Sequence, residues 1–146
     1  MKKTENANSQ NELLAMIKLN AAFPYSANKI DQLINIFGSA EEAVKASAKD
    51  LFENASFTLD SAEKAVKFFK EFSSEKEMMM AEKNGIKILA RNSPEYPKKL
   101  AFIYDSPAIL YSKGDCSKLE MPSAAIVGTR HPSHYGMRMA YCLSAG

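Results

Sequence analysis

The sequence has no tryptophan and only two cysteines among its 146 residues. Cys116 and Cys142 form no C-x-x-C pair, so their spacing predicts neither a zinc site nor a redox motif. The sequence also lacks an apolar run of roughly 18 residues and an apolar signal core near its N-terminus. These absences predict a cytoplasmic chain with no disulfide, no membrane span and no metal.

A strong net charge is absent as well, since the formal value is only +2. The charge is unevenly distributed, however. Residues 83–146 contain nine Lys and Arg against four Asp and Glu, while residues 1–82 carry a net charge of −3. A basic half favours a partner rich in phosphate, but scattered surface lysines explain the same charge equally well.

Apolar residues recur at helical spacing between residues 11 and 72. The pattern predicts a compact bundle of four or five short helices, preceded by a polar and flexible N-terminus at residues 1–10. Phe68, Phe69 and Phe72 have the spacing of a buried helix face, which favours a core role over a nucleic-acid stacking platform. We therefore expect a helical domain at residues 11–74.

The pattern changes after Gly85, where three short strands are predicted at IKILAR, AILYSKG and AAIVG. The third strand is apolar on both faces, which is typical of the middle of a parallel sheet covered on both sides. The run MRMAYCLSAG then reads as an amphipathic helix. The predicted fold is thus α/β: a small helical bundle, followed at residues 75–146 by the incomplete start of a Rossmann-like parallel α/β domain.

The segment AAIVGTRHPSHYG, residues 124–136, is the strongest candidate site. A strand, a loop and a helix N-terminus in this order favour an anion, because strand ends and free backbone N–H groups converge there. Gly128 permits close backbone approach, Thr129 offers a hydroxyl donor, and Arg130 can grip a phosphate with two N–H groups. The G-x7-G spacing matches neither the dinucleotide fingerprint nor the P-loop.

The rest of the segment supports the same site. Ser133 suits the helix N-cap, Gly136 allows close approach, and Tyr135 either stacks on a base or packs at the start of the helix. His131 and His134 are a pair without further ligands, so they predict no metal site. No nucleophile–base set or carboxylate pair is evident, and we expect no catalysis. The predicted phosphate-binding residues are Gly128, Thr129, Arg130, Ser133, Tyr135 and Gly136.

With these residues the sequence resembles the DNA-processing protein A family, also called DprA or Smf. AAIVGTRHPSHYG resembles the opening of its Rossmann-like domain, and FGSAEEAVKASAKDLFE resembles part of its SAM-like helical domain. Between them, GIKILARNSPEYPKKLAFIYDSPAILYSKG resembles the approach to the Rossmann-like domain. The resemblance runs from about residue 11 to residue 146.

The resemblance implies binding and protection of single-stranded DNA without sequence preference. It also implies loading of a RecA-type recombinase during natural transformation, a family homodimer, and no cofactor. Carried over to this sequence, Gly128, Thr129 and Arg130 match the phosphate site, with Arg130 as the main clamp. Tyr135 and Gly136 match the end of the same motif.

Two departures from the family pattern stand out. AAFPYS replaces a Gly-Ile-Gly-Pro-like turn that suits DNA contact, and the later Ser-Gly-x-Ala-x-Gly-Ile-Asp segment is absent. We therefore expect a truncated member whose dimer surface and recombinase contact are missing or weakened, and whose Rossmann-like part self-associates. Two alternatives remain open: a nucleotide hydrolase of the lysine-decarboxylase-like group, and an inactive fragment.

Overall fold

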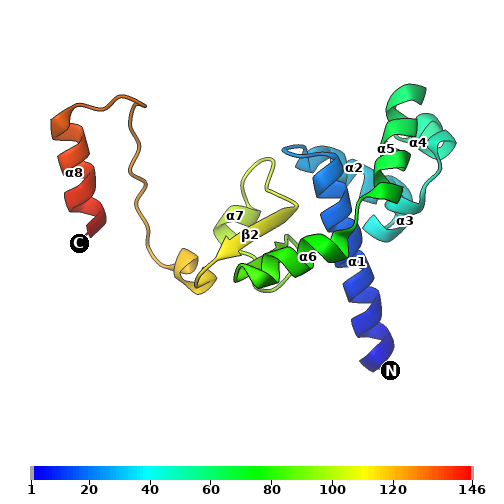
Figure 1. Cartoon of the computed structure of the whole chain (residues 1–146), viewed down its shortest axis with the longest axis horizontal. Helices are drawn as coiled ribbons and strands as arrows, with labels where there is room; N and C mark the ends of the chain where they lie inside the picture. Colours follow the sequence, from blue (N-terminus) through cyan, green and yellow to red (C-terminus); the bar gives the residue numbers. More distant parts are fainter. Residues whose placement is uncertain (1, 146) are drawn as a thin grey trace.

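The computed structural model describes the backbone of residues 2–145 and the side chains of residues 9–145. Its first half is a bundle of helices that packs around α1 (Figure 1). The bundle consists of α1 (Lys2–Ala22), α2 (Ala27–Phe37), α3 (Ala40–Lys45), α4 (Ala48–Asn54) and α5 (Leu59–Glu71). Helices are thus present where the spacing predicts them. The first helix begins within the polar N-terminus, whose flexibility remains a prediction.

The core of the bundle is formed by apolar residues that recur three or four positions apart. Ile17, Leu33 and Leu51 are almost completely buried, and burial of each such side chain contributes about 1.5–3 kcal/mol. The ring of Phe23 meets Phe57 and Phe69 edge to face, with centroid distances of 5.8 and 6.2 Å. Phe69 is buried, which confirms the core role predicted for it.

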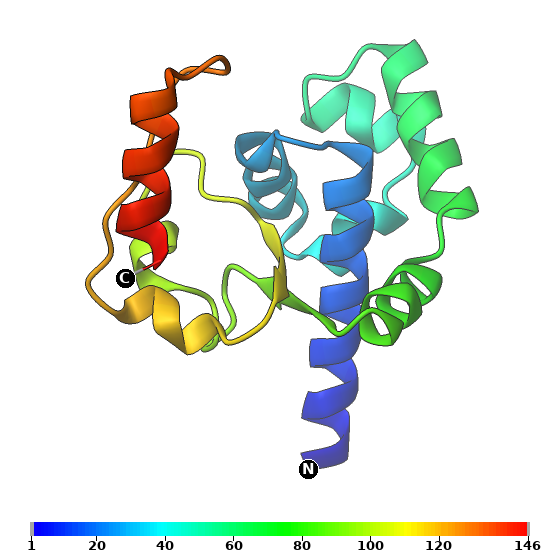
Figure 2. The ribbon, with the colours of Figure 1, turned by 60° about the vertical axis from the view of Figure 1, so that its left-hand side comes forward.

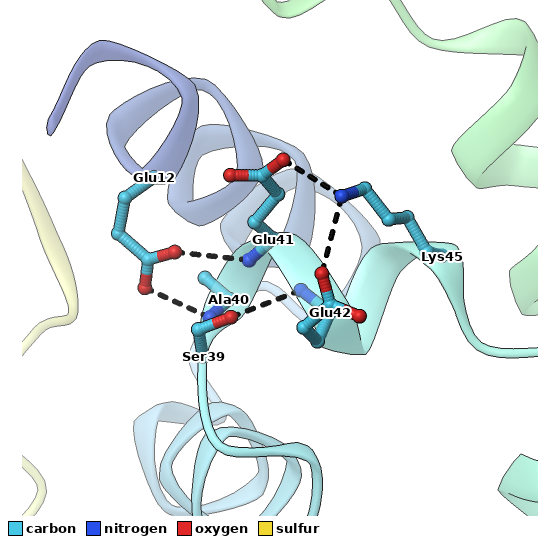
Figure 3. A network of polar contacts seen from close by, with 6 residues as sticks. All are labelled: Glu12, Ser39, Ala40, Glu41, Glu42 and Lys45. Atoms are coloured by element: carbon cyan, nitrogen blue, oxygen red, sulfur yellow. Dashed lines mark hydrogen bonds and ion pairs between the residues drawn. The ribbon is translucent and has the colours of Figure 1, made fainter. Parts of the chain in front are cut away.

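Side-chain oxygen atoms satisfy the free N–H groups at the start of α3 (Figure 3). Both carboxylate oxygens of Glu12, on α1, accept backbone hydrogen bonds, from Ala40 at 2.8 Å and from Glu41 at 3.0 Å. Ser39 Oγ accepts a third, from Glu42 N–H at 3.1 Å. A negative group at a helix N-terminus also interacts favourably with the helix dipole. Glu12 therefore ties α1 to α3.

Helix α6 (Ser74–Lys83) and a small sheet follow the bundle. Ser74 is buried, and its hydroxyl donates to Leu14 O at 2.7 Å, which fixes α6 against α1. Strands β1 (Ile86–Ala90) and β2 (Ile109–Lys113) pair in register from Ile86↔Lys113 to Ala90↔Ile109. Two of the three expected strands therefore form, and strands follow the helical bundle.

The parallel pairing expected for these strands is wrong, because β1 and β2 run antiparallel. A parallel pair needs a crossover long enough to return to the same end of the sheet. Residues 91–108 are numerous enough for a crossover, but they contain only the one-turn helix α7 (Lys98–Ala101) and no longer helix that could pack across the sheet. Tyr96 holds this connection closed, since its hydroxyl donates to Pro107 O at 2.9 Å.

The chain leaves this packed part through a 3-10 turn, η1 (Cys116–Glu120), and ends in α8 (His134–Ala145). Figures 1 and 2 show that a long connection joins η1 to α8, with no helix or strand running beside it. The strand expected at residues 124–128 is wrong for this structure, since the segment is extended without a ladder. No described segment lies beside it to supply hydrogen bonds. Cys142 is exposed, because nothing described covers α8.

Candidate nucleic-acid interface

The predicted site lies on the connection between η1 and α8 and on the first turn of α8. Residues 121–135 are exposed throughout, including the apolar side chains of Ile126 and Val127. Within the described residues, the site is therefore open to solvent and does not lie in a cleft. It presents its groups to any ligand that reaches this face.

Gly128, Thr129 and Arg130 follow one another in the extended part of this connection. A Cβ atom added at Gly128 would meet no atom within 4 Å, so a ligand could approach the backbone closely there. Within the described residues, the side chains of Thr129 and Arg130 make no hydrogen bond or ion pair. The guanidinium therefore keeps its five donors available for an anion.

Ser133 is the N-cap of α8, as the sequence predicts. Its Oγ accepts the Gly136 N–H at 3.2 Å, and its carbonyl accepts the Met137 N–H at 3.0 Å. A Cβ added at Gly136 would lie 3.5 Å from Ser133 Oγ, which is ordinary contact. Contacts with the described residues therefore do not require a glycine at position 136.

Tyr135 and His134 lie on the first turn of α8, and both are exposed. The backbone N–H groups of the first helical residues have no partner inside a helix, and they add a partial positive charge. The structure therefore brings together, along one short stretch of chain, Arg130, the Thr129 hydroxyl and the start of α8. The Tyr135 ring is free to meet a ligand at the same end.

The described residues contain no candidate metal site. No group of three or more His, Cys, Asp or Glu side chains converges there. His131 and His134 both lie exposed, without a third ligand. Within residues 2–145, no helix is both long and apolar enough to cross a membrane.

One cavity lies away from the predicted site. It has a volume of about 770 Å³ and opens between α1 and β1, where Leu13, Met16 and Ile88 contribute apolar walls. A second cavity, of about 550 Å³, is lined by Tyr25, Asp105 and the start of β2. The sequence predicts no function for Tyr25, which stands between Pro24 and Ser26.

The C-terminal part of the chain is similar to known proteins. Residues 87–146 match the family model described as DNA recombination-mediator protein A. The curated "DNA processing protein DprA" of Bacillus subtilis (strain 168) is 43% identical over 56 residues. That match covers 38% of this chain and only 19% of the relative's length. No solved structure matches the chain.

Proposed function

We propose that residues 128–136 bind the phosphates of single-stranded DNA, and that the chain takes part in DNA processing during recombination. The observation that carries the proposal is the exposed, unpaired Arg130 between Gly128 and the capped start of α8. Arginine offers a planar fork that matches the geometry of a phosphate. The excess of basic residues after residue 83 adds long-range attraction.

The finer parts of the expectation belong to the same proposal. They are a SAM-like helical domain at residues 11–74, the start of a Rossmann-like domain at residues 75–146, and a cytoplasmic protein without catalytic activity. Loading of a RecA-type recombinase and a family homodimer are proposed partners of the whole protein. The family match favours this account over a nucleotide hydrolase.

Fluorescence anisotropy of a labelled single strand of about 30 nucleotides tests the proposal. We expect Kd to rise steeply with salt, with a slope of about 0.7 in log K for each neutralised phosphate. Arg130→Ala should weaken binding roughly tenfold and lower that slope, because it removes charge-assisted hydrogen bonds. A duplex of the same length should bind less tightly.

Arg138→Ala is the matched control, since it removes the same charge from an exposed position on α8. The proposal requires Arg130→Ala to weaken binding clearly more than Arg138→Ala does. Equal losses would mean that only net charge matters, and the phosphate site would be rejected. No binding by the folded parent chain would reject it as well.

A further inference from the structure

Three aromatic side chains project into solvent from two short loops. Tyr25, between α1 and α2, is 98% exposed, while Phe102 and Tyr104, just after α7, are 89% and 92% exposed. Single exposed apolar residues are common and need no explanation. Three nearly bare rings on two loops that adjoin one another are unusual in a part of the chain that is otherwise well packed.

The two loops are neighbours, although nearly 80 residues separate them in sequence. The Asn28 N–H lies 3.4 Å from Asp105 Oδ1 and donates to it across the gap. Tyr25 and Asp105 also line the same cavity of about 550 Å³, together with Pro107 and Tyr111. Figure 1 shows the two loops side by side near the labels α2 and α7.

Each of the two loops contains one residue with a positive φ. Tyr25 and Asp105 have φ values of 61° and 60°, in the left-handed region that non-glycine residues adopt at a cost. Two side-chain hydrogen bonds hold the loop that follows α7. Tyr96 donates to Pro107 O, and Arg91 donates to Ser106 O at 3.0 Å. Rings on anchored loops lose little freedom when a flat ligand stacks on them.

The charges beside the rings favour a nucleic acid over another apolar surface. Lys98 and Lys99 begin α7, four and three residues before Phe102, and both are exposed. The Lys99 ammonium donates to Met121 O at 2.8 Å, and the Glu120 carboxylate accepts the Lys98 backbone N–H at 2.8 Å. Asp105, the acid on this loop, has its carboxylate engaged by the Asn28 N–H. Aromatic rings next to lysines are the usual means of binding a single strand, because bases stack on the rings and phosphates approach the ammonium groups.

We propose that Tyr25, Phe102 and Tyr104 form a stacking platform for the bases of a single-stranded nucleic acid, with Lys98 and Lys99 beside its phosphates. The proposal rests on the DNA binding proposed above and adds a second contact region, apart from Arg130. It assigns base contact to the packed part of the chain, where Lys98 and Lys99 add phosphate contacts to those of the C-terminal segment.

The absence of tryptophan provides a direct test. In a Tyr104→Trp variant, all indole emission reports on position 104, and stacking of a base on an indole quenches it. We expect quenching when a 30-nucleotide single strand is added. An abasic strand of equal length keeps the phosphates and should bind by anisotropy without quenching. Quenching by both strands, or by neither while binding occurs, would overturn the platform.

Affinity supplies a second, independent readout. Tyr104→Ala should weaken single-strand binding about fivefold or more, as the loss of one stacked base predicts. Phe52→Ala is the matched control, because Phe52 is also exposed but lies on α4. Circular dichroism checks that both variants fold.

The outcomes separate this inference from the proposed function. If Tyr104→Ala binds like Phe52→Ala while Arg130→Ala is weakened, the platform is rejected and the phosphate site stands. If Tyr104→Ala is weakened and Arg130→Ala is not, the phosphate site falls and the platform stands. A parent chain that binds no single strand rejects both, and self-association lost on Tyr104→Ala would assign the rings to contact between copies instead.

Discussion

The packed part of the chain, through β2, and the segment after η1 use similar residues with opposite results. Ile17 and Leu33 are 0% and 1% exposed in the bundle, whereas Val127 and Leu143 are 89% and 68% exposed near the C-terminus. Both regions place apolar residues at regular spacing. The comparison teaches that spacing determines which face of a helix or strand is apolar. Burial of that face requires a neighbouring element.

Helices and strands respond differently when cover is missing. An α-helix makes its hydrogen bonds within itself, so α8 forms while most of its surface is exposed. A strand makes its hydrogen bonds to a neighbour, so residues 124–128 are extended and unpaired. The same segment therefore leaves its backbone and Arg130 accessible.

The largest effect should come from shortening one leucine in each region. Leu51→Ala creates a cavity in the bundle core and should lower the free energy of unfolding by about 2–5 kcal/mol. Leu143→Ala removes the same atoms from an exposed position and should change it by less than about 0.5 kcal/mol. Urea unfolding followed by circular dichroism measures both, and equal losses would contradict the comparison.

A smaller effect should follow from neutralising the carboxylate that joins α1 to α3. Glu12→Gln weakens the bonds from the Ala40 and Glu41 N–H groups and should cost roughly 1–2 kcal/mol of unfolding free energy. Glu63→Gln is the control, since Glu63 is exposed on α5. Urea midpoints that agree for the two variants would show that Glu12 does not hold the bundle together.

The smallest effect concerns the reciprocal cap at the start of α4. Hydrogen bonds from the Ser47 hydroxyl and N–H hold the pKa of Asp50 below its ordinary value. Stabilisation from this carboxylate is therefore fully present above the ordinary pKa of Asp and disappears as pH falls through the lowered pKa. Ser47→Ala should lower the thermal midpoint at neutral pH and lower it by less in acid, where only the bond from the Asp50 N–H to Ser47 Oγ remains to be lost.

The control for this prediction is Ser144→Ala, which changes the same atoms on α8. Its thermal midpoint should match that of the parent at every pH. A gap between Ser47→Ala and the parent that stays constant, or widens, on acidification would rule out the coupling to Asp50.

Local signals in the sequence predict local structure well. Ser133 caps α8 as expected. Ser39 caps α3 in the same way, and Gly38 ends α2 in the left-handed conformation with φ of 89°. Ser26 precedes α2 and is a residue type that favours the N-cap, yet its side chain makes no cap hydrogen bond. The helices of the bundle follow from apolar spacing, because each makes its own backbone bonds.

Features that depend on distant partners were not predictable from one sequence. The antiparallel direction of β1 and β2 depends on how residues 91–108 turn, and the turn is set by contacts such as Tyr96 to Pro107. The Glu12 cap on α3 joins residues nearly 30 positions apart. Within the candidate site, the Ser133 cap was predictable, whereas the full exposure of residues 124–130 was not.

Hydrogen exchange of the chain, alone and with a 30-nucleotide single strand, tests the central claim most directly. The account predicts slow exchange in α1 and α5, fast exchange at residues 122–133, and slowing of exchange around Arg130 when the strand is added. Exchange at residues 122–133 as slow as in the bundle, or no change around Arg130 under conditions where the strand is bound, would contradict the account.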